Sequence, residues 1–345
     1  MKPYLPCRWL VLSDGAHPTE DIYFSDVAKW LSSCGYRSAY VDTREISPWR
    51  YWPWQGYAWH RANVLVTRSL KEPWLGWLER HREWFGEIYY LLDDDLLAAA
   101  RDLSVPEEYR LRMRDLVCNI QPRLFALADE VVVCSETLAT VTRHHHSRVS
   151  VLTPSLISEL PDHDHHRRIR RDIGFHGTRA HIGDLEAITS AIQAVHEHYP
   201  QSDFEIMLGD NTPDSLKSLE RVECPTALKW REFLDYQRGR RLHIGLAPLW
   251  PSAFNRGKSW IKVLDIAVMG GVGIYSARSP YSDVVTDGQD GLLVEDDPLA
   301  WQSALERLLD YPSDTERMAK AAGKTAADIG NAVQAQEFWW QRTKG

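Results

Sequence analysis

Short apolar runs alternate with longer helical segments along almost the whole chain, and this alternation constrains the fold more than any other feature. In the first half, apolar runs of strand length lie at residues 8–14, 37–43, 62–68 and 87–95, with helical spacing between them. After a polar stretch at residues 155–171 the same scheme begins again. Strands that alternate with helices form parallel sheets with helices on both faces. The chain is therefore predicted to be an α/β protein with two Rossmann-like parallel sheets.

The stretch at residues 155–171 is charged and rich in histidine, and it is typical of an interdomain linker. We expect one domain at residues 1–155 and a second at residues 156–330. In two parallel α/β domains joined in this way, the C-terminal ends of the strands face each other across a cleft, and ligands bind there. Further strands of the second domain are expected at residues 171–178, 203–210, 228–230, 242–250, 272–276 and 291–296.

The composition fits a soluble globular protein, with 345 residues of which 44% are hydrophobic and 26% charged. The net charge of −8 argues against nucleic-acid binding. The five cysteines form no CxxC pair, so neither a disulfide framework nor a zinc site is indicated. No apolar run reaches the roughly 18 residues that span a bilayer. These observations predict a cytoplasmic protein.

A turn of small and polar residues follows the first strand of the second half. Gly177 and Thr178 end that strand, and His181 opens the next helix. A glycine lets the backbone approach a ligand closely, and a helix N-terminus favours a phosphate. These residues are therefore candidates for phosphate binding, and a plain strand–helix turn is the alternative.

Residues 255–259, Asn-Arg-Gly-Lys-Ser, lead into a helix predicted at residues 260–269. Arg256 and Lys258 can neutralise a diphosphate, and Ser259 can cap the helix and donate to a phosphate oxygen. Asp265 lies two turns into the helix, where a carboxylate can bind the two hydroxyls of a ribose. The alternative is that Lys258 and Asp265 face only solvent. The remaining candidates on this side of the cleft are Asn255, Pro280 and Tyr281.

Three carboxylates, Asp93, Asp94 and Asp95, close the strand at residues 87–95 and are candidate catalytic residues. Such a triplet can chelate a divalent metal. One aspartate can instead act as general base on an acceptor hydroxyl, or the triplet can bind acceptor hydroxyls or cap the next helix. In the loop after the first strand, His17 is a candidate for proton transfer and Asp14 for acceptor binding, with a polar surface loop as the alternative.

Tryptophan is overrepresented, with 15 copies, seven of them between positions 49 and 84. Trp74, Trp77 and Trp84 recur at helical spacing and are expected in the core. The segment at residues 48–59 contains two prolines and a glycine, so we expect it to be neither strand nor helix. It is a candidate acceptor-binding loop in which Trp52, Trp54 and Trp59 stack on sugar rings. Aromatic residues beside arginines also suit a membrane interface.

Histidines gather at residues 144–146 and 163–166. Their spacing matches no structural zinc pattern, so no metal site is predicted there.

The stretch from Phe254 to Trp301 resembles the donor-binding half of bacterial GT-B glycosyltransferases. Its loop, helix, glycine pair, strand and acidic loop follow the order of the retaining enzymes of that class. GTxxHxxDL at residues 177–185, DDDL at 93–96 and ADEVVVCSETL at 128–138 are also similar to bacterial GT-B segments. The resemblance covers residues 170–310 with good order and spacing, and the first half in outline.

The resemblance implies a GT-B fold, a nucleotide-sugar donor bound without a divalent metal, and a last helix, residues 331–345, that packs back on the first domain. One departure concerns a pair of glutamates eight positions apart in that family. Its second position is Asp265 here, and its first is Gly257, which has no side chain. The contact of that first acid with the donor sugar must therefore come from another group.

The predicted function is transfer of a hexosyl or deoxyhexosyl unit from a nucleoside-diphosphate sugar to a glycan or lipid-linked acceptor, in bacterial surface polysaccharide synthesis. Retention of stereochemistry and peripheral association with the inner face of the membrane are expected from the same resemblance. No other cofactor and no nucleic-acid partner are expected. A non-catalytic GT-B-like binding module and a GT-B-shaped epimerase or phosphorylase are the alternatives.

Overall fold

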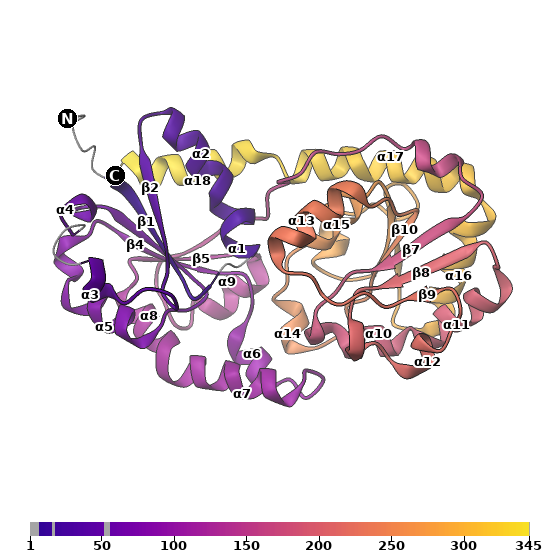
Figure 1. The fold of residues 1–345 in the computed structure, drawn as a ribbon, viewed down its shortest axis with the longest axis horizontal. Helices are drawn as coiled ribbons and strands as arrows, with labels where there is room; N and C mark the ends of the chain where they lie inside the picture. Colours follow the sequence, from indigo (N-terminus) through magenta and orange to yellow (C-terminus); the bar gives the residue numbers. More distant parts are fainter. Residues whose placement is uncertain (1–6, 16–17, 52–55, 345) are drawn as a thin grey trace.

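The structure, a computed structural model, describes residues 7–15, 18–51 and 56–344. Each half of the chain forms one six-stranded sheet, and every strand pair in both sheets is parallel (Figure 1). The predicted α/β class with two parallel sheets is thereby confirmed. The first sheet has the order β2-β1-β3-β4-β5-β6, with β1 (Cys7–Ser13), β2 (Arg37–Asp42), β3 (Asn63–Thr67), β4 (Ile88–Leu92), β5 (Glu130–Val133) and β6 (Val149–Val151). The second has the order β12-β11-β10-β7-β8-β9, with β7 (Arg171–Phe175), β8 (Ser202–Ile206), β9 (Val222–Glu223), β10 (Ile244–Ala247), β11 (Val272–Ser276) and β12 (Gly291–Val294).

Helices connect these strands and cover the sheets (Figure 1). Those of the first half are α1 (Pro18–Glu20), α2 (Asp26–Ser33), α3 (Pro48–Tyr51), α4 (Gly56–Trp59), α5 (Glu72–Arg80), α6 (Leu96–Arg101), α7 (Glu107–Asp115), α8 (Gln121–Leu127) and α9 (Glu136–Thr142). Those of the second half are α10 (Ile182–Ala187), α11 (Thr189–His198), α12 (Asp214–Lys217), α13 (Trp230–Gly239), α14 (Ala253–Arg256), α15 (Ile261–Val268), α16 (Pro298–Asp310), α17 (Pro312–Ile329) and α18 (Ala332–Lys344). No helix in the described ranges has the length and apolar character needed to cross a bilayer.

Strands β3 and β4 lie in the middle of the first sheet, and every residue of both is buried. Their near-continuous apolar sequences fit this position, because a parallel sheet is covered on both faces. Their register pairs Thr67 with Leu91. The polar residues that follow, Arg68 and Asp93, therefore emerge side by side at the C-terminal edge of the sheet.

The last helix belongs to the core of the first half. Helix α17 runs along the second half, and α18 continues from it onto the first (Figure 1). Trp339 of α18 is fully buried, and its ring lies 5.3 Å from that of Trp9 and 5.2 Å from that of Phe24. Its indole N–H donates to the carbonyl of Tyr23 at 2.8 Å, and Trp9 donates to the hydroxyl of Thr343 at 2.9 Å.

Three predictions in the tryptophan-rich segment are wrong. Short helices α3 and α4 replace the expected irregular loop, and Trp59 is buried with 4% of its surface exposed, its ring 6.4 Å from those of Trp74 and Trp77. Trp59 is therefore not part of an exposed acceptor loop. Trp84, expected in the core, is 38% exposed because α5 ends at Arg80 and the helical spacing does not continue.

The predicted strand at residues 228–230 is also absent. Residues 228 and 229 form irregular chain, Trp230 is the first residue of α13, and the edge strand of the second sheet is β9 instead.

Two adjacent histidines of the connecting segment are buried, which its polar composition did not predict. His165 and His166 are each 4% exposed, with their rings 4.3 Å apart and both 5.1 Å from that of His243. His165 bonds the carbonyl of Leu242 at 2.8 Å, and His166 bonds that of Gly270 at 3.0 Å. These contacts fasten residues 155–171 to the second half.

Burial lowers the pKa of His165 and of His166 to about 4. The carbonyls that they bond raise both pKa values in part, whereas the neighbouring histidines lower them further. Arg241 also lowers the pKa of His165. Both histidines thus bind a proton more weakly in the folded chain than in the unfolded chain, where the value is 6.5. Their contribution to stability is complete above that pH and is lost as the pH falls towards 4.

We expect the free energy of unfolding, measured by urea denaturation, to fall in this window by up to about 1.4 kcal/mol per pH unit for each of the two histidines. His166→Gln removes one titrating group and should reduce the slope. The matched change at an exposed histidine, His60→Gln, should leave the slope unchanged. Equal slopes in the wild type and His166→Gln would contradict this account.

Candidate active site at the junction of the two sheets

The loop between α14 and α15 reaches from the second half to the C-terminal edge of the first sheet. The carbonyl of Gly257 accepts a hydrogen bond from the hydroxyl of Ser135, which follows β5, at 3.0 Å. The next residue, Lys258, places its Nζ 2.6 Å from Oδ1 of Asp94, which follows β4. The predicted diphosphate-binding lysine and the predicted aspartate triplet therefore meet.

The three aspartates of the triplet have different partners. Asp93 and Asp94 both bind Arg68, with Nη1 of the arginine 2.8 Å and 3.1 Å from their respective oxygens. Asp93 also accepts a hydrogen bond from the hydroxyl of Thr19. Asp95 instead caps α6, where its side chain accepts from the backbone N–H of Ala98 at 2.8 Å. The triplet thus combines an ion-pair network with a helix cap.

The environment of Asp94 keeps it ionised. Burial raises its pKa, but Lys258 and Arg68 more than offset this and hold the pKa below its usual value. A carboxylate with a lowered pKa is a weaker proton acceptor at neutral pH, so the structure favours charge pairing over general-base action for Asp94. No cluster of three or more metal-ligating side chains occurs within the described residues.

Asp184, at the start of α10, holds the donor-side candidates together. Its Oδ1 accepts from the backbone N–H of Trp250 at 2.7 Å and from the amide of Asn255 at 3.0 Å. Its Oδ2 lies 2.9 Å from Nδ1 of His181. Burial lowers the pKa of His181, and nearby Lys258 and Lys262 lower it further, while Asp184 opposes them. The His181 imidazole thus bonds a buried carboxylate and lies within electrostatic range of Lys258 and Lys262.

Asp265 is also tied to its neighbours. Its Oδ1 accepts from the amide of Gln237 at 3.0 Å, and Nζ of Lys262 lies 3.0 Å from Oδ2. Tyr281 is buried, and its pKa is raised by burial and by nearby Asp184 and Asp265. Asp265 therefore lies close to the His181–Asp184 group.

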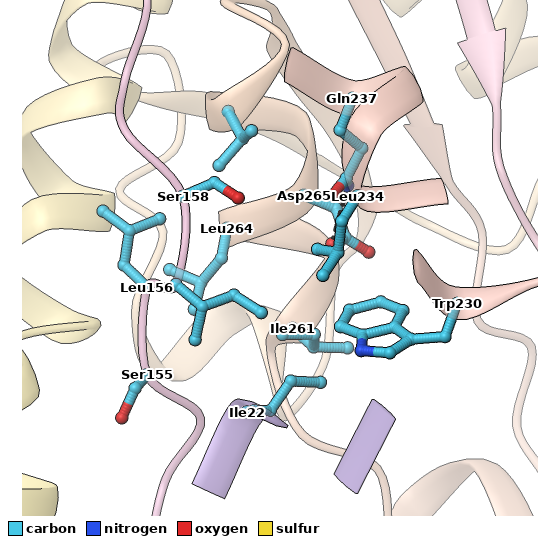
Figure 2. Close-up of a pocket in the computed structure, with 12 residues that line it drawn as sticks. Ile22, Ser155, Leu156, Ser158, Trp230, Leu234, Gln237, Ile261, Leu264 and Asp265 are labelled. Atoms are coloured by element: carbon cyan, nitrogen blue, oxygen red, sulfur yellow. Dashed lines mark hydrogen bonds between the residues drawn. The ribbon is translucent and has the colours of Figure 1, made fainter. Parts of the chain in front are cut away.

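A small pocket of about 20 Å³ borders Asp265 (Figure 2). It lies between residues 155–158, α13 and α15, and Trp230 and Gln237 line it. This volume holds little more than a water molecule, whereas ligand pockets measure about 300–1,000 Å³. Trp230 also bonds Asp21 of the first half, with 2.7 Å between Nε1 and Oδ2. The pocket is too small for a nucleoside in this structure.

The remaining predicted residues are less central or have structural roles. Ser259 is buried beside Tyr23 and does not cap α15, whose N-cap is Trp260; this capping prediction is wrong because the helix starts one residue later. Arg256 and Thr178 are exposed. Pro280 is buried, and Asp14 forms an ion pair with Lys71 at 3.4 Å. His17, Trp52 and Trp54 lie outside the described residues.

Packing accounts for both glycines at the site. A Cβ on Gly177 would lie 2.7 Å from the ring of Phe175. A Cβ on Gly257 would lie 3.3 Å from that of Asp95, so the side chain of a glutamate would have to extend into the contact between the two halves. The acid expected at position 257 is therefore absent where the loop packs most closely on the first sheet.

Arg68 and Trp230 are the main residues that the sequence reasoning missed. Arg68 has a φ of +57°, which is unusual for a residue other than glycine, and its guanidinium binds two carboxylates. The only signal in the sequence is its place at the end of a predicted strand. Trp230 has no local signal, because its contact with Asp21 joins residues 209 positions apart.

Comparison with known proteins places this geometry in a known fold. No protein-family model matches the chain, and no curated protein matches it. Among solved structures, a sucrose-phosphate synthase from Thermosynechococcus elongatus superposes with a TM-score of 0.67 at 14% identity, covering 98% of each chain. HepE of Anabaena, in complex with UDP and glucose, gives 0.64 at 11% identity, over 98% of this chain and 99% of that one. A glycosyltransferase from Rickettsia africae gives 0.59 at 11% identity, over 98% of each. The chain has the GT-B fold that the resemblance implied.

The capping role of Asp95 can be tested separately from any catalytic role. Asp95→Ala should lower the free energy of unfolding by about 1 kcal/mol, because α6 loses its N-cap. Asp95→Asn keeps an oxygen that can accept from Ala98 and should stay within a few tenths of a kcal/mol of the wild type. Chemical denaturation of both variants measures the difference, and equal losses would rule out capping.

Proposed function

We propose that the chain is a glycosyltransferase that moves a hexosyl or deoxyhexosyl unit from a nucleoside-diphosphate sugar to a glycan or lipid-linked acceptor. The observation that carries the proposal is the position of Lys258, at the junction of the two sheets and beside His181. Lys262 adds a second ammonium group on the same side. The GT-B fold and the UDP and glucose held by HepE support this class of donor.

In the proposed reaction the bond between the sugar C1 and the diphosphate oxygen breaks, and the acceptor oxygen bonds to C1 while its hydroxyl proton passes to an oxygen of the departing diphosphate. The departing diphosphate gains negative charge, and Lys258 and Lys262 are placed to stabilise it. Their positive charge also supports donor binding without a divalent metal. Asp265, held by Gln237, is the proposed ligand of the ribose hydroxyls. The order of segments at residues 254–301 supports retention of stereochemistry, as in the transferases that it resembles.

Lys258 binds Asp94 in the structure, so the donor diphosphate must compete with a carboxylate for the same ammonium group. Separation of the halves breaks this pair and also opens the pocket beside Asp265. Renewed closure would exclude water, which otherwise hydrolyses the donor. Binding and domain movement are thus linked through one side chain.

Lys258→Ala should lower turnover by about 100-fold or more, because it removes charge stabilisation of the leaving diphosphate. Release of UDP, GDP, dTDP or CMP from the corresponding nucleotide sugars, with and without EDTA, measures turnover before the acceptor is known. Lys258→Arg keeps the charge and should retain part of the activity. Lys324→Ala, an exposed lysine on α17, is the matched control.

Near-normal activity of Lys258→Ala would contradict the assignment of Lys258 to the diphosphate site. A thermal shift with nucleotides but no sugar release or transfer would favour a binding module. Absence of any shift with the whole panel would overturn the nucleotide-sugar proposal.

We also propose peripheral association with the inner face of a membrane, as suits a lipid-linked acceptor in bacterial surface polysaccharide synthesis. Trp49 is 55% exposed and Trp84 38% exposed, and the guanidinium of Arg80 lies 5.7 Å from the Trp49 ring. Indoles beside basic groups favour the interfacial region of a bilayer.

Sedimentation with vesicles that contain anionic lipid tests this association. Trp49→Ala and Trp84→Ala together should reduce the bound fraction, because they remove the two exposed indoles. Leu103→Ala, at an 82% exposed apolar residue elsewhere, should not. An unchanged bound fraction in the tryptophan variant would contradict the proposed surface.

A further inference from the structure

A polar groove of about 900 Å³ lies between the edge of the first sheet and the second half of the chain. One wall comes from α2 and β2, and the other from α13. None of the proposed diphosphate and ribose ligands lines it. Its volume is near the upper end of the range of ligand pockets, about 300–1,000 Å³, so it suits a ligand of several rings.

The charges along the groove balance. Four acidic and four basic side chains line it: Glu20, Asp21, Asp26 and Asp235, with Lys29, Arg37, Arg231 and Arg238. Two of these acids are neutralised within their own helices, because Asp26 lies 2.6 Å from Lys29 and Asp235 lies 2.7 Å from Arg238. A groove without net charge gives no electrostatic advantage to a phosphate or a polyanion. It does offer many hydrogen-bond donors and acceptors to an uncharged, hydroxyl-rich ligand.

The groove also has an aromatic surface. Tyr40 on the edge strand β2 is 46% exposed and lines the same wall as Ser25 and Ser38. A tyrosine ring combines an apolar body with a polar tip. It therefore suits a ligand with apolar C–H faces and hydroxyl edges, which is the chemistry of a sugar ring.

One end of the groove reaches the junction of the two sheets. Glu20 lines the groove, and its carboxylate accepts from the hydroxyl of Thr67, at the end of β3, at 3.2 Å. The preceding residue, Thr19, donates to Asp93 of the junction. A chain of sugars in the groove would thus have one end beside the network of Asp93, Asp94 and Lys258.

We infer that this groove is the acceptor site and that it takes an uncharged oligosaccharide of several sugar units. The inference rests on the proposed transferase function and names the class of its acceptor. The aromatic contact is assigned to Tyr40 rather than to the tryptophan-rich segment, where Trp59 is buried. Arg231, exposed on the α13 wall, supplies hydrogen bonds from the other half of the chain.

An array of neutral and acidic oligosaccharides, probed with the full chain, tests the inference. The wild type should bind neutral glycans, and Tyr40→Ala should weaken this binding about tenfold through loss of the aromatic contact. Arg231→Ala, on the opposite wall, should also weaken the binding of neutral glycans. Because Arg231 is exposed on α13, this result would not depend on correct folding of β2. Tyr311→Ala, at a 64% exposed tyrosine outside the groove, is the matched control.

Absence of neutral-glycan binding, preference for acidic glycans, or full binding by both groove variants would overturn the inference. Thermal shifts with the same nucleotide-sugar panel are measured on these proteins and should be unchanged in the groove variants. Nucleotide binding without neutral-glycan binding would reject the groove alone. Glycan binding without nucleotide binding would reject the proposed transferase function instead.

Discussion

The contact between Lys258 and Asp94 is the interaction on which the site depends, because it joins the two sheets at their facing edges. Arg68 supports this contact by forming ion pairs with both Asp93 and Asp94. These side chains are largely removed from water, and a buried charge that loses its partner costs several kcal/mol. The junction is therefore stable either with its own ion pairs or with another anion in place of Asp94. A diphosphate carries the charge that such an exchange requires.

Asp184 and Asp265 are also fixed by hydrogen bonds and ion pairs. Each carboxylate is held by its neighbours: Asp184 by His181, Asn255 and the backbone of Trp250, and Asp265 by Gln237 of α13 and by Lys262 of its own helix. Residues fixed in this way lose little freedom when a ligand arrives, which is what preorganisation means for a binding site. The groove beside α2 and α13 is built differently, with exposed side chains on two separate walls. A site that holds a long acceptor and releases it after transfer fits that looser construction.

Much of the fold follows from local sequence, because apolar strands and periodic helices leave a strong pattern over 345 residues. The candidate site could be predicted from the sequence in part. Lys258 and the aspartate triplet are predicted from their places at the ends of strands and helices, and Lys258 contacts Asp94 in the structure. What could not be predicted depends on contacts between distant residues. The role of Arg68 is seen only from its ion pairs with Asp93 and Asp94. The burial of His165 and His166 depends on their hydrogen bonds to the distant carbonyls of Leu242 and Gly270. Trp59 is buried because its ring packs against those of Trp74 and Trp77, and Trp84 is exposed because α5 ends at Arg80.

The position of α18 has a consequence for how the chain is made. Trp339 fills the core beside Trp9 and Phe24, so the first half lacks part of its interior until α18 has been synthesised. During synthesis the ribosome releases residues 7–151 long before it releases α18, and the apolar surface around Trp9 stays uncovered for that time. Nascent chains with such surface are prone to aggregate and are bound by chaperones. Completion of the first half is thus delayed until α18 has been synthesised, when the strands of both halves are already present.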